Sequence, residues 1–545
     1  MKRILLLMVC ILCSTLSHAQ KKNVLFIAID DLNDWTGAFG GNPQSITPNL
    51  DALANKGVAF QNAYCASPVC NPSRTAILTG RRPHATGLVN NDGGRNFRED
   101  DQQWVRELIT MPEYFSSQGY ESVAQGKIFH KHDSNPEVWD VLGPGGQGAA
   151  GGVNDEVAGI SWGYSPNEKL EETGDWKSAD YGAQYLAKNH DKPFFLAIGL
   201  FRPHLPFRAP KEFFDLFDPD TLNIPAGYKA NDLQDAYSRG SNNKLSEVQA
   251  AGKWKEVIRA YLACIAFADA NLGHLIDALD DSQYADNTIV VLWGDHGWHL
   301  GEKEHFQKFT LWERAIKTPL IIYDPSKGSG NSFYPVSLQD LYPTLVSLAG
   351  IEQPDFEVRG RDLTPLLEDP DREDWCGAAL TSYSTGHSIR SNQFRYTLYN
   401  NGEEELYDHK NDPWEWENLA NHSDLADQKQ QMAEALNQMK EFEESPFEQC
   451  ESVVVRDSQT SEGIKLGINM EYQENDILIY PNPSDGILHI LKQNQYWEAS
   501  YQVFGANGVE LIQGTGGLLD MNSNAAGRYW LRLEGYESAI PILLN

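Results

Sequence analysis

The sequence has 545 residues, of which 41% are hydrophobic and 22% are charged, with a formal net charge of −32. This composition is globular, which excludes collagen-like, coiled-coil and fully disordered chains, and the length predicts about three to four domains. A chain this acidic is a poor candidate for binding nucleic acid or an anionic membrane surface, so an anionic substrate would need a local cluster of basic side chains.

Residues 1–19 have the pattern of a secretory signal peptide. Lys2 and Arg3 precede a short apolar run, Ile4–Cys13, and Ser17–Ala19 supplies small residues before the expected cleavage site. The apolar run is too short to span a bilayer, and no later run reaches about 18 apolar residues. We therefore expect a secreted or cell-surface protein with no membrane span.

Between residues 20 and 380, apolar strand-like runs alternate with helical stretches, which predicts an α/β domain. Thr47 and Pro48 predict the start of a helix, and a stripe of apolar residues predicts a long helix from Glu247 to Leu279. The expected strands, which should be buried on both faces of a sheet, are Val24–Ile29, Pro193–Phe201, Thr288–Trp293, Leu320–Tyr323 and the weaker run Glu121–Ala124.

The remaining sequence divides into three parts. Residues 381–450 contain short strand patterns, such as Phe394–Tyr399, and then a helix rich in Gln and Glu, which predicts a small α+β subdomain. Residues 451–475 are polar without a clear period and are interpreted as a linker. Residues 476–545 contain short strand patterns separated by Pro and Gly, which predicts a small β-sandwich.

Polar side chains follow four of the expected strands. Ligands of open α/β sheets bind beyond the carboxyl ends of the strands, so these side chains are expected to meet. They are Asp30 and Asp31, Lys127 and His130, Arg202 and His204, and Asp295 and His296. One Asp-Asp pair alone is more often a cap or a turn, but carboxylates on two strand ends favour a hard cation. Calcium suits an extracellular site better than magnesium, and an imidazole-rich set would have favoured zinc.

The most distinctive motif is Cys70–Arg74, with the sequence Cys-Asn-Pro-Ser-Arg, followed by Leu-Thr-Gly at 78–80. A helix is expected to begin near the cysteine, and a helix N-terminus close to Arg74, Arg81 and Arg82 would form an anion site. The residues alone leave two other interpretations open, which are a buried structural cysteine and a thiolate nucleophile activated by a histidine.

This motif resembles the signature of the type I, formylglycine-dependent sulfatase family, and the resemblance extends from Asn23 to about Leu419. It implies an alkaline-phosphatase-like sandwich around a mostly parallel central sheet, and the activity of a sulfuric ester hydrolase. The branch that this sequence resembles is the iduronate-2-sulfatase group. The segments that carry this second resemblance are Asp31–Asp34, Gly80–Pro83, Gly126–His130, Arg202–Phe207 and Gly294–Trp298.

The resemblance implies two cofactors. The first is formylglycine, made from Cys70 by a formylglycine-generating or sulfatase-maturating enzyme. The second is a calcium ion. Its ligands would be Asp30, Asp31, Asp295, His296 and the modified Cys70. Many members of the family have Asn where this sequence has His296, whereas the iduronate-like branch has His.

The resemblance also implies catalytic roles for Arg74, Lys127, His130, His204 and Lys308. Arg74 would steady the formylglycine, whose hydrate attacks sulfur with one hydroxyl. His204, assisted by Lys308, would protonate the leaving alcohol, and His130 would take the proton of the second hydroxyl. Preorganised positive charge stabilises the charge that spreads over the sulfate oxygens. Taken singly, each of these side chains is more often solvated or structural.

Substrate contacts are predicted for residues that follow the two motifs. Trp298 and His299 come after the metal pair, where an aromatic ring can stack on a sugar, although packing under the loop is the alternative. Further candidates, some of which would bind a substrate carboxylate, are Arg81, His84, Asn91 and Arg95.

The end of the sequence resembles the C-terminal sorting domain of the type IX secretion system. The resemblance rests on Tyr480–Gly486 and on Gly527–Leu533. It implies the type IX secretion machinery as a partner and a location outside the outer membrane. A carbohydrate-binding β-module is the alternative.

The leading interpretation is an extracellular sulfatase that hydrolyses sulfate esters of a sulfated polysaccharide or its oligosaccharides, with an ulvan-type substrate expected from the iduronate-like branch. Three alternatives stay open. They are a phosphatase or phosphonate hydrolase of the same superfamily, a non-catalytic scaffold that binds sulfated glycans, and a cysteine hydrolase that uses Cys70 with His130 or His204. The last of these predicts inactivation by thiol alkylation and indifference to calcium chelation.

Overall fold

The computed structural model describes residues 21–91, 96–145, 152, 154–237, 242, 244–372 and 374–441, and eight strands between Ile477 and Leu544. These residues form two compact units. The first contains residues 21–34 and 46–441, and the second contains residues 35–45 and the C-terminal strands. The predicted signal peptide and the predicted linker at 451–475 lie outside the described residues, and all domain boundaries stay predictions.

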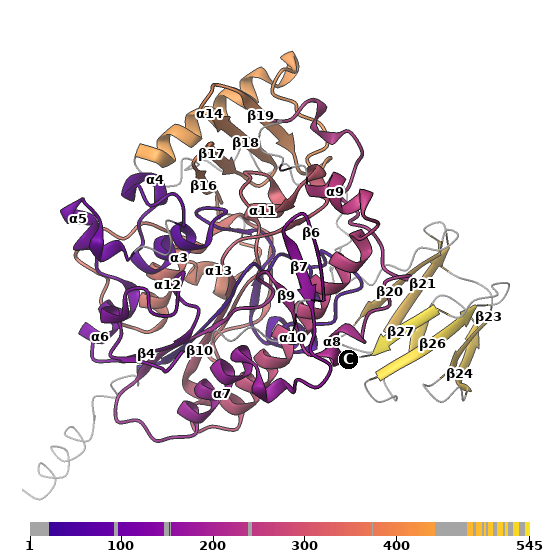
Figure 1. Ribbon diagram of the computed structural model, residues 1–545, viewed down its shortest axis with the longest axis horizontal. Coiled ribbons are helices and arrows are strands. Elements are labelled where there is room, and N and C mark those ends of the chain that lie inside the picture. Colours follow the sequence, from indigo (N-terminus) through magenta and orange to yellow (C-terminus); the bar gives the residue numbers. More distant parts are fainter. Residues whose placement is uncertain are drawn as a thin grey trace, which may run out of the picture. The chain divides into compact units, whose positions relative to one another are not determined.

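An eight-stranded mixed sheet forms the centre of the first unit (Figure 1). Its order is β14 (Gly330–Ser332), β2 (Val58–Phe60), β13 (Leu320–Tyr323), β10 (Thr288–Gly294), β1 (Asn23–Ile29), β8 (Phe194–Leu200), β4 (Glu121–Gly126) and β5 (Val141–Leu142). The five strands from β10 to β5 are parallel neighbours, whereas β13 is antiparallel to β10. The five predicted strands are all present, which confirms the mostly parallel sheet.

Helices cover both faces of this sheet (Figure 1). For that reason β1, β8 and β10 are buried along their whole length and have continuously apolar sequences. One face packs against α3 (Cys70–Thr79), α6 (Met111–Ser117) and α12 (Leu341–Leu348). The other face is covered by α2 (Pro48–Lys56), α7 (Gly174–Leu186) and α10 (Trp254–Asp280).

The predicted helix from Glu247 to Leu279 is two helices. α9 (Lys244–Ala250) ends before Gly252, which has φ +66°, and α10 begins at Trp254. This left-handed conformation ends a helix and is accessible to glycine at little cost, so the chain breaks between the two helices. The apolar stripe of Trp254, Ile258, Leu262 and Ile265 lies wholly in α10. α10 is long and apolar enough to cross a membrane, but 72% of its apolar window is buried inside the fold, as in a core helix.

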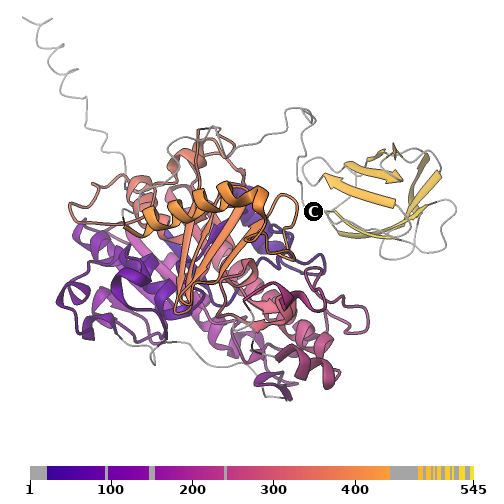
Figure 2. The same ribbon diagram turned by 90° about the horizontal axis from the view of Figure 1, so that it is seen from above.

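A smaller antiparallel sheet follows, with an order equal to the chain order. It contains β16 (Ala379–Tyr383), β17 (Gly386–Arg390), β18 (Phe394–Tyr399) and β19 (Glu404–Asp408). Figure 2 shows α14 (Ala426–Glu441) lying across one face of this sheet. Apolar residues of alternate strand positions, such as Leu380 and Ile389, pack against Leu436 of the helix. The arrangement is the strand-and-helix subdomain predicted for this part of the chain.

The second unit contains two four-stranded antiparallel sheets. The first comprises β20 (Ile477–Asn482), β21 (Ile487–Lys492), β22 (Gln495–Tyr496) and β25 (Leu518–Asp520). The second comprises β23 (Ser500–Phe504), β24 (Glu510–Thr515), β26 (Gly527–Leu533) and β27 (Ile540–Leu544). Two sheets of short strands agree with the predicted β-rich domain, and its role in secretion stays a prediction.

Candidate active site

The carboxyl ends of four adjacent strands, β10, β1, β8 and β4, lie at one edge of the central sheet. Each strand is followed directly or within four residues by groups that the sequence singled out, and these groups are Asp295 and His296, Asp30 and Asp31, His204, and Lys127 and His130. Cys70 reaches the same edge as the first residue of α3. The convergence expected from the strand ends is therefore present.

The thiol of Cys70 is fully buried in a positively charged surrounding. The His130 side chain also favours the thiolate form of Cys70. Burial disfavours the thiolate, but the charges of Lys127, Lys308 and His296 outweigh burial and hold the pKa of the thiol well below its usual range. The polar contacts of its Sγ include Lys308 Nζ at 2.9 Å, His296 Nε2 at 3.3 Å, Lys127 Nζ at 3.9 Å and Asp31 Oδ1 at 4.0 Å.

Arg74 holds two carboxylates in place beside the thiol. Its Nε donates to Asp295 Oδ2 at 2.8 Å, and its NH2 group donates to Asp30 Oδ1 at 3.1 Å. The remaining guanidinium hydrogen bonds go to the backbone carbonyls of Lys127 and Ile128. Arg74 lies four residues after Cys70, and residues with this spacing share one face of a helix. The fixed fork of a guanidinium suits this task better than a lysine would.

Four buried groups offer atoms that could bind one metal ion. The ligand atoms of Asp31, Cys70, Asp295 and His296 all lie within 4.8 Å of one another. Asp31 Oδ2 is buried and has no hydrogen-bond partner among the described residues. A buried carboxylate oxygen without a partner is energetically costly unless it coordinates a cation. Burial also raises the pKa of Asp295 to about 6, despite the opposing effect of Arg74. The donor set therefore fits a divalent cation, and its carboxylates are the part that suits a hard one.

The backbone at Asp31 is unusual. Asp31 has φ +60°, a left-handed conformation that residues other than glycine rarely adopt, and its N–H donates to Asp295 Oδ1 at 2.9 Å. Tyr261 of α10 donates its hydroxyl hydrogen to the Asp31 carbonyl at 2.7 Å. These contacts fix the turn after β1 in a strained conformation of the kind that clusters at functional sites.

Both candidate proton carriers are half-buried. The His204 side chain is 26% exposed, and its Nε2 lies 3.9 Å from Asp31 Oδ2. His130 is half-buried, and its Nδ1 is buried without a partner in the described part of the chain. His204 thus lies beside Asp31, one of the candidate metal ligands, whereas His130 favours the thiolate form of Cys70. Arg202 is buried and bonds to the carbonyls of His204 and Arg208, so it supports the loop.

The structure places the predicted substrate residues unevenly. Asn91 lies beside the start of α3, since its Oδ1 accepts a hydrogen bond from the N–H of Asn71 at 3.0 Å. Trp298 and His299 are both buried. The ammonium group of Lys308 lies over the Trp298 ring, so these two side chains support the segment that carries Lys308. Arg81 lies beyond the far end of α3, a helix of 10 residues that is ~15 Å long, and it pairs with Glu357.

His84 lies at the contact between α4 (Pro83–Thr86) and the small sheet. Its Nδ1 lies 3.1 Å from Ser382 Oγ and its Nε2 lies 3.4 Å from the Lys440 carbonyl, so both ring nitrogens have structural partners. Arg95 lies outside the described residues. The substrate roles of all six of these side chains stay predictions.

Sequence reasoning missed several residues that position the site. Asp175 accepts the N–H groups of Phe201 and Arg202 at 2.7 and 2.9 Å and so fixes the loop that carries His204. Ser73 donates to the Asp295 carbonyl at 2.7 Å. Tyr261 and Asp175 are far from the motifs in sequence and have no distinguishing pattern. Ser73 lies inside the cysteine motif, which was the one available signal.

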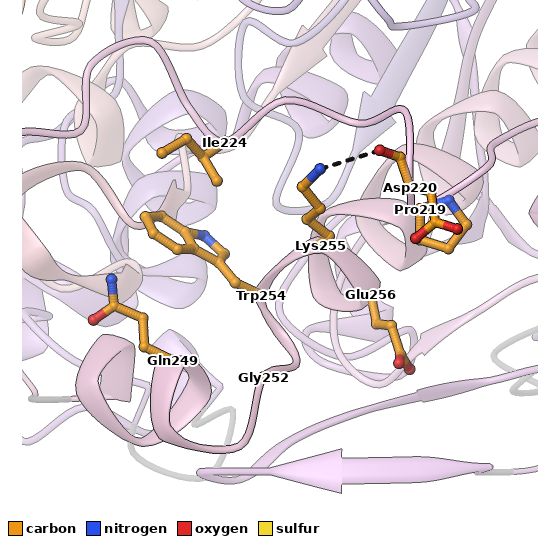
Figure 3. Close-up of a pocket in the computed structure, with 8 residues that line it drawn as sticks. All are labelled: Pro219, Asp220, Ile224, Gln249, Gly252, Trp254, Lys255 and Glu256. Carbon is orange, nitrogen blue, oxygen red and sulfur yellow. Dashed lines mark hydrogen bonds between the residues drawn. The ribbon is translucent and has the colours of Figure 1, made fainter.

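Lys308 reaches the thiol from a short hairpin, β11 (His299–Leu300) and β12 (Phe306–Gln307). Trp254 supports this hairpin from outside, because its Nε1 donates to the Leu300 carbonyl at 2.7 Å. Trp254 also lines a surface pocket of about 390 Å³ between α9, α10 and the segment around Pro219 (Figure 3). None of the predicted site residues lines this pocket, so it is separate from the group around Cys70.

Comparison with known proteins identifies the family. The sulfatase family matches residues 22–351, and a family described as N-sulphoglucosamine sulphohydrolase, C-terminal, matches residues 301–442. A sulfatase of Formosa agariphila is 37% identical over 453 residues, which are 76% of this chain and 88% of the relative. The iduronate 2-sulfatase of Homo sapiens is 30% identical over 62% of this chain and 70% of its own length. An ulvan-active sulfatase of Formosa agariphila is 28% identical over 73% and 77%.

Solved structures share the fold. A protein solved with its substrate D-glucosamine-2-N,6-O-disulfate has a TM-score of 0.62 at 24% identity, over 77% of this chain and 98% of that chain. The phosphonate monoester hydrolase of Agrobacterium radiobacter has a TM-score of 0.63 at 21% identity, over 77% and 95%. These likenesses confirm the predicted alkaline-phosphatase-like fold. Because the family match spans more than half of the sequence, the chain belongs to the sulfatase family and is a sulfuric ester hydrolase.

Proposed function

We propose that this sulfatase is an extracellular enzyme that hydrolyses sulfate esters of a sulfated polysaccharide or its oligosaccharides. The observation that carries the proposal is the positive environment of Cys70 within a chain of net charge −32. Two lysine ammonium groups, Lys127 and Lys308, lie within 4 Å of the thiol, and the imidazole of His296 is equally near. Such a local cluster is what an anionic ester needs in an acidic protein.

We further propose that residue 70 is formylglycine and that Asp30, Asp31, Asp295, His296 and residue 70 bind a calcium ion. Together these groups supply a hydroxyl nucleophile and positive charge for the sulfate oxygens. Because the Cys70 side chain is fully buried, the formylglycine-generating or sulfatase-maturating enzyme must act before the chain closes around it. The typical chemistry of the family and the buried acid and histidine cluster support this part of the proposal.

The chain's own side chains then have distinct tasks. Lys127 and Lys308 bind and neutralise the sulfate oxygens, on which negative charge accumulates as the ester bond breaks. His204 donates a proton to the departing sugar oxygen, because its imidazole is partly exposed and lies beside Asp31. His130, an imidazole that favours the thiolate form of Cys70, accepts a proton at residue 70. The net result adds the elements of water, so that the S–O ester bond breaks and alcohol and sulfate are released.

The substrate and the location are inferred from relatives and from sequence. Similarity to an ulvan-active sulfatase and to iduronate 2-sulfatase supports an ulvan-type substrate that contains sulfated rhamnose and uronic acids. The signal-peptide pattern of residues 1–19 and the resemblance of residues 476–545 to a sorting domain support export through the type IX secretion machinery.

The second candidate is a phosphonate or phosphate ester hydrolase, which the likeness to a phosphonate monoester hydrolase favours. The test is a screen of the purified protein, co-expressed with a maturating enzyme, on ulvan oligosaccharides, glycosaminoglycan oligosaccharides and a phenyl phosphonate ester. Sulfate or phenol release is the readout. We expect the protein to release sulfate from a saccharide. A chelator should abolish this release, and added calcium should restore it. Hydrolysis of the phosphonate ester that is faster than sulfate release would contradict the proposal.

Mass spectrometry of the peptide that contains Cys70 completes the test. An aldehyde at residue 70 in the active protein is the expected result. An active protein with an unmodified thiol that iodoacetamide inactivates would instead support a cysteine hydrolase, and a protein without any hydrolytic activity that still binds the oligosaccharides would support a binding scaffold.

A further inference from the structure

Phe309 is an exposed aromatic residue directly beside a buried lysine of the site. Its side chain is 37% exposed, whereas the neighbouring Lys308 is 3% exposed and lies against Cys70. Most phenylalanine side chains of a globular fold are inside, and a large exposed ring at a site is more informative than an exposed ring elsewhere. The environment of Phe309 therefore needs an explanation other than core packing.

The backbone around Phe309 is strained. Gln307 and Phe309 both have φ +77°, and Lys303 and Glu304 earlier in the same segment have φ +54° and +48°. Left-handed conformations of residues other than glycine cost about 1–2 kcal/mol each, and bulky residues adopt them rarely. Gln307 and Phe309, the two residues with φ +77°, flank Lys308. The lysine side chain therefore lies inside the fold, whereas the adjacent aromatic ring is exposed. Strain of this kind persists where the surrounding structure enforces it.

Tyr383 extends the aromatic surface. It ends β16 of the small sheet, is half-buried, and its ring centre lies 6.5 Å from that of Phe309 with an interplanar angle of 35°. Tyr383 packs against a small buried cluster of Tyr237, Leu311 and Tyr399, in which the rings of Tyr237 and Tyr399 stack at 3.9 Å. We call Phe309 and Tyr383 the aromatic platform. A firm layer lies behind it, contributed by parts of the chain far apart in sequence.

The side chain of Lys308 connects the aromatic platform with residue 70, where the reaction takes place. Lys308 Nζ is 2.9 Å from Cys70 Sγ and 5.8 Å from the centre of the Phe309 ring. A sulfate group bound by Lys308 next to residue 70 would therefore have its ester oxygen and sugar near this ring. Aromatic rings bind the apolar C–H faces of sugars through dispersion and burial, and they add no charge that would repel an anionic polymer.

We propose that Phe309 and Tyr383 bind the sugar ring that carries the sulfate ester and thereby select saccharide sulfates over small esters without a ring. This inference rests on the proposed function, since it assigns the saccharide side of the same site. It also explains the strained segment, because Lys308 binds the anionic end of the substrate and Phe309 binds its apolar face. It also assigns the aromatic contact to Phe309, whereas Trp298 is buried under the loop.

The test compares Phe309→Ala and Tyr383→Ala with the wild-type enzyme on the best saccharide sulfate of the screen. We expect KM to rise about tenfold for each variant, a loss of ~1.4 kcal/mol, with kcat within about twofold of wild type. The inhibition constant of inorganic sulfate should not change, because sulfate contacts Lys308 and not the rings. Phe309→Tyr should restore the wild-type KM. The matched control is Phe333→Ala, which removes another exposed ring (45%), one that follows the edge strand β14.

An unchanged KM in both variants would overturn the inference, as would an equal rise of the sulfate inhibition constant, which would mean that the rings merely support Lys308. If the wild-type protein released sulfate from no saccharide, the proposed function would fail instead. The platform would then be tested by calorimetric titration of the same sulfated oligosaccharides, in which tighter binding by wild type than by Phe309→Ala supports it and equal or absent binding rejects it.

Discussion

Lys308 and Asp31 form a buried ion pair in which Nζ lies 2.6 Å from Oδ1. Burial disfavours the charged ammonium, but Asp31 and the thiol of Cys70 outweigh it and hold the pKa of Lys308 above its usual range. Lys308 is therefore a fixed positive charge at any working pH. This favours a role in binding the sulfate oxygens, with His204 as the proton donor.

Replacement of Lys308 by methionine should lower kcat/KM for a saccharide sulfate by about 10²-fold or more, since one preorganised charge at a reacting group is typically worth that much. The measurement is initial-rate sulfate release. Lys211→Met, which removes an exposed lysine paired with Asp215, is the matched control and should retain wild-type kcat/KM. A Lys308→Met enzyme within a few-fold of wild type would contradict the assigned role.

Calcium should stabilise the folded protein through the acid cluster. A ligand that binds only the folded state at 100 times its dissociation constant adds about 2.7 kcal/mol, so thermal unfolding of wild type should shift upward when calcium replaces chelator. Asp31→Asn should lose this shift, because Asp31 contributes the carboxylate oxygen that has no hydrogen-bond partner among the described residues. Asp280→Asn, at an exposed pair with Lys56, should keep it. An equal calcium shift in Asp31→Asn would place the ion elsewhere.

Arg395 should be a structural requirement of the small sheet. Glu313, His409 and Glu415 form a second buried group with the geometry of a metal site, but the Arg395 guanidinium pairs with both carboxylates, at 2.6 Å for Glu415 Oε1. Removal of one partner from such a buried network costs about 3–5 kcal/mol, so Arg395→Met should lower Tm strongly. Calorimetry with Arg372→Met, at an exposed pair with Asp374, as control checks this. Rescue of Arg395→Met by a divalent metal would contradict charge compensation by arginine.

Acid should destabilise the contact between α4 and the small sheet. Burial lowers the pKa of His84 to about 4, with a smaller contribution from Arg82, and burial together with Lys440 lowers the pKa of His387 to about 4. Since both folded pKa values lie below the ordinary 6.5, the stability that they contribute is complete above pH 6.5 and is lost as the pH falls towards 4. After allowance for partial exposure the effect is about 1–2 kcal/mol for each histidine.

The corresponding measurement is Tm at pH 5 and pH 7.5. His84→Gln and His387→Gln should each show a smaller decrease in Tm between these pH values than wild type, and His422→Gln, at an exposed side chain, should behave as wild type. A pH dependence that is the same in all four proteins would contradict the account of this contact.

Sequence patterns predicted the parts of the site that the sheet itself positions. Asp30, Asp31 and Asp295 follow continuously apolar strands, and neighbouring parallel strands end at the same edge, so their convergence follows from the fold class. Lys308 was found through family resemblance alone, because it comes from a hairpin whose residues have no distinctive period. Gly252 separates α9 from α10, and a glycine within a predicted helix does not reveal whether it will adopt φ +66°.

The exposure of the loop side chains was beyond sequence reasoning for a related reason. Trp298 was a candidate for stacking on a sugar, yet it is buried, and Phe309 drew no prediction, yet it is exposed. Both lie in irregular backbone, where positive φ values at Gln307 and Phe309 reverse the direction of successive side chains. No periodic pattern assigns faces to such a segment.

The most direct test of the central claim is sulfate release by the wild-type protein and by Cys70→Ala, both co-expressed with a maturating enzyme and measured by ion chromatography on the same sulfated oligosaccharide. Ester hydrolysis through residue 70 predicts release by wild type and a loss of about 10³-fold or more in Cys70→Ala, whose mass should match its substituted sequence and which should keep a folded thermal transition. Sulfate release by Cys70→Ala at the wild-type rate would contradict the claim.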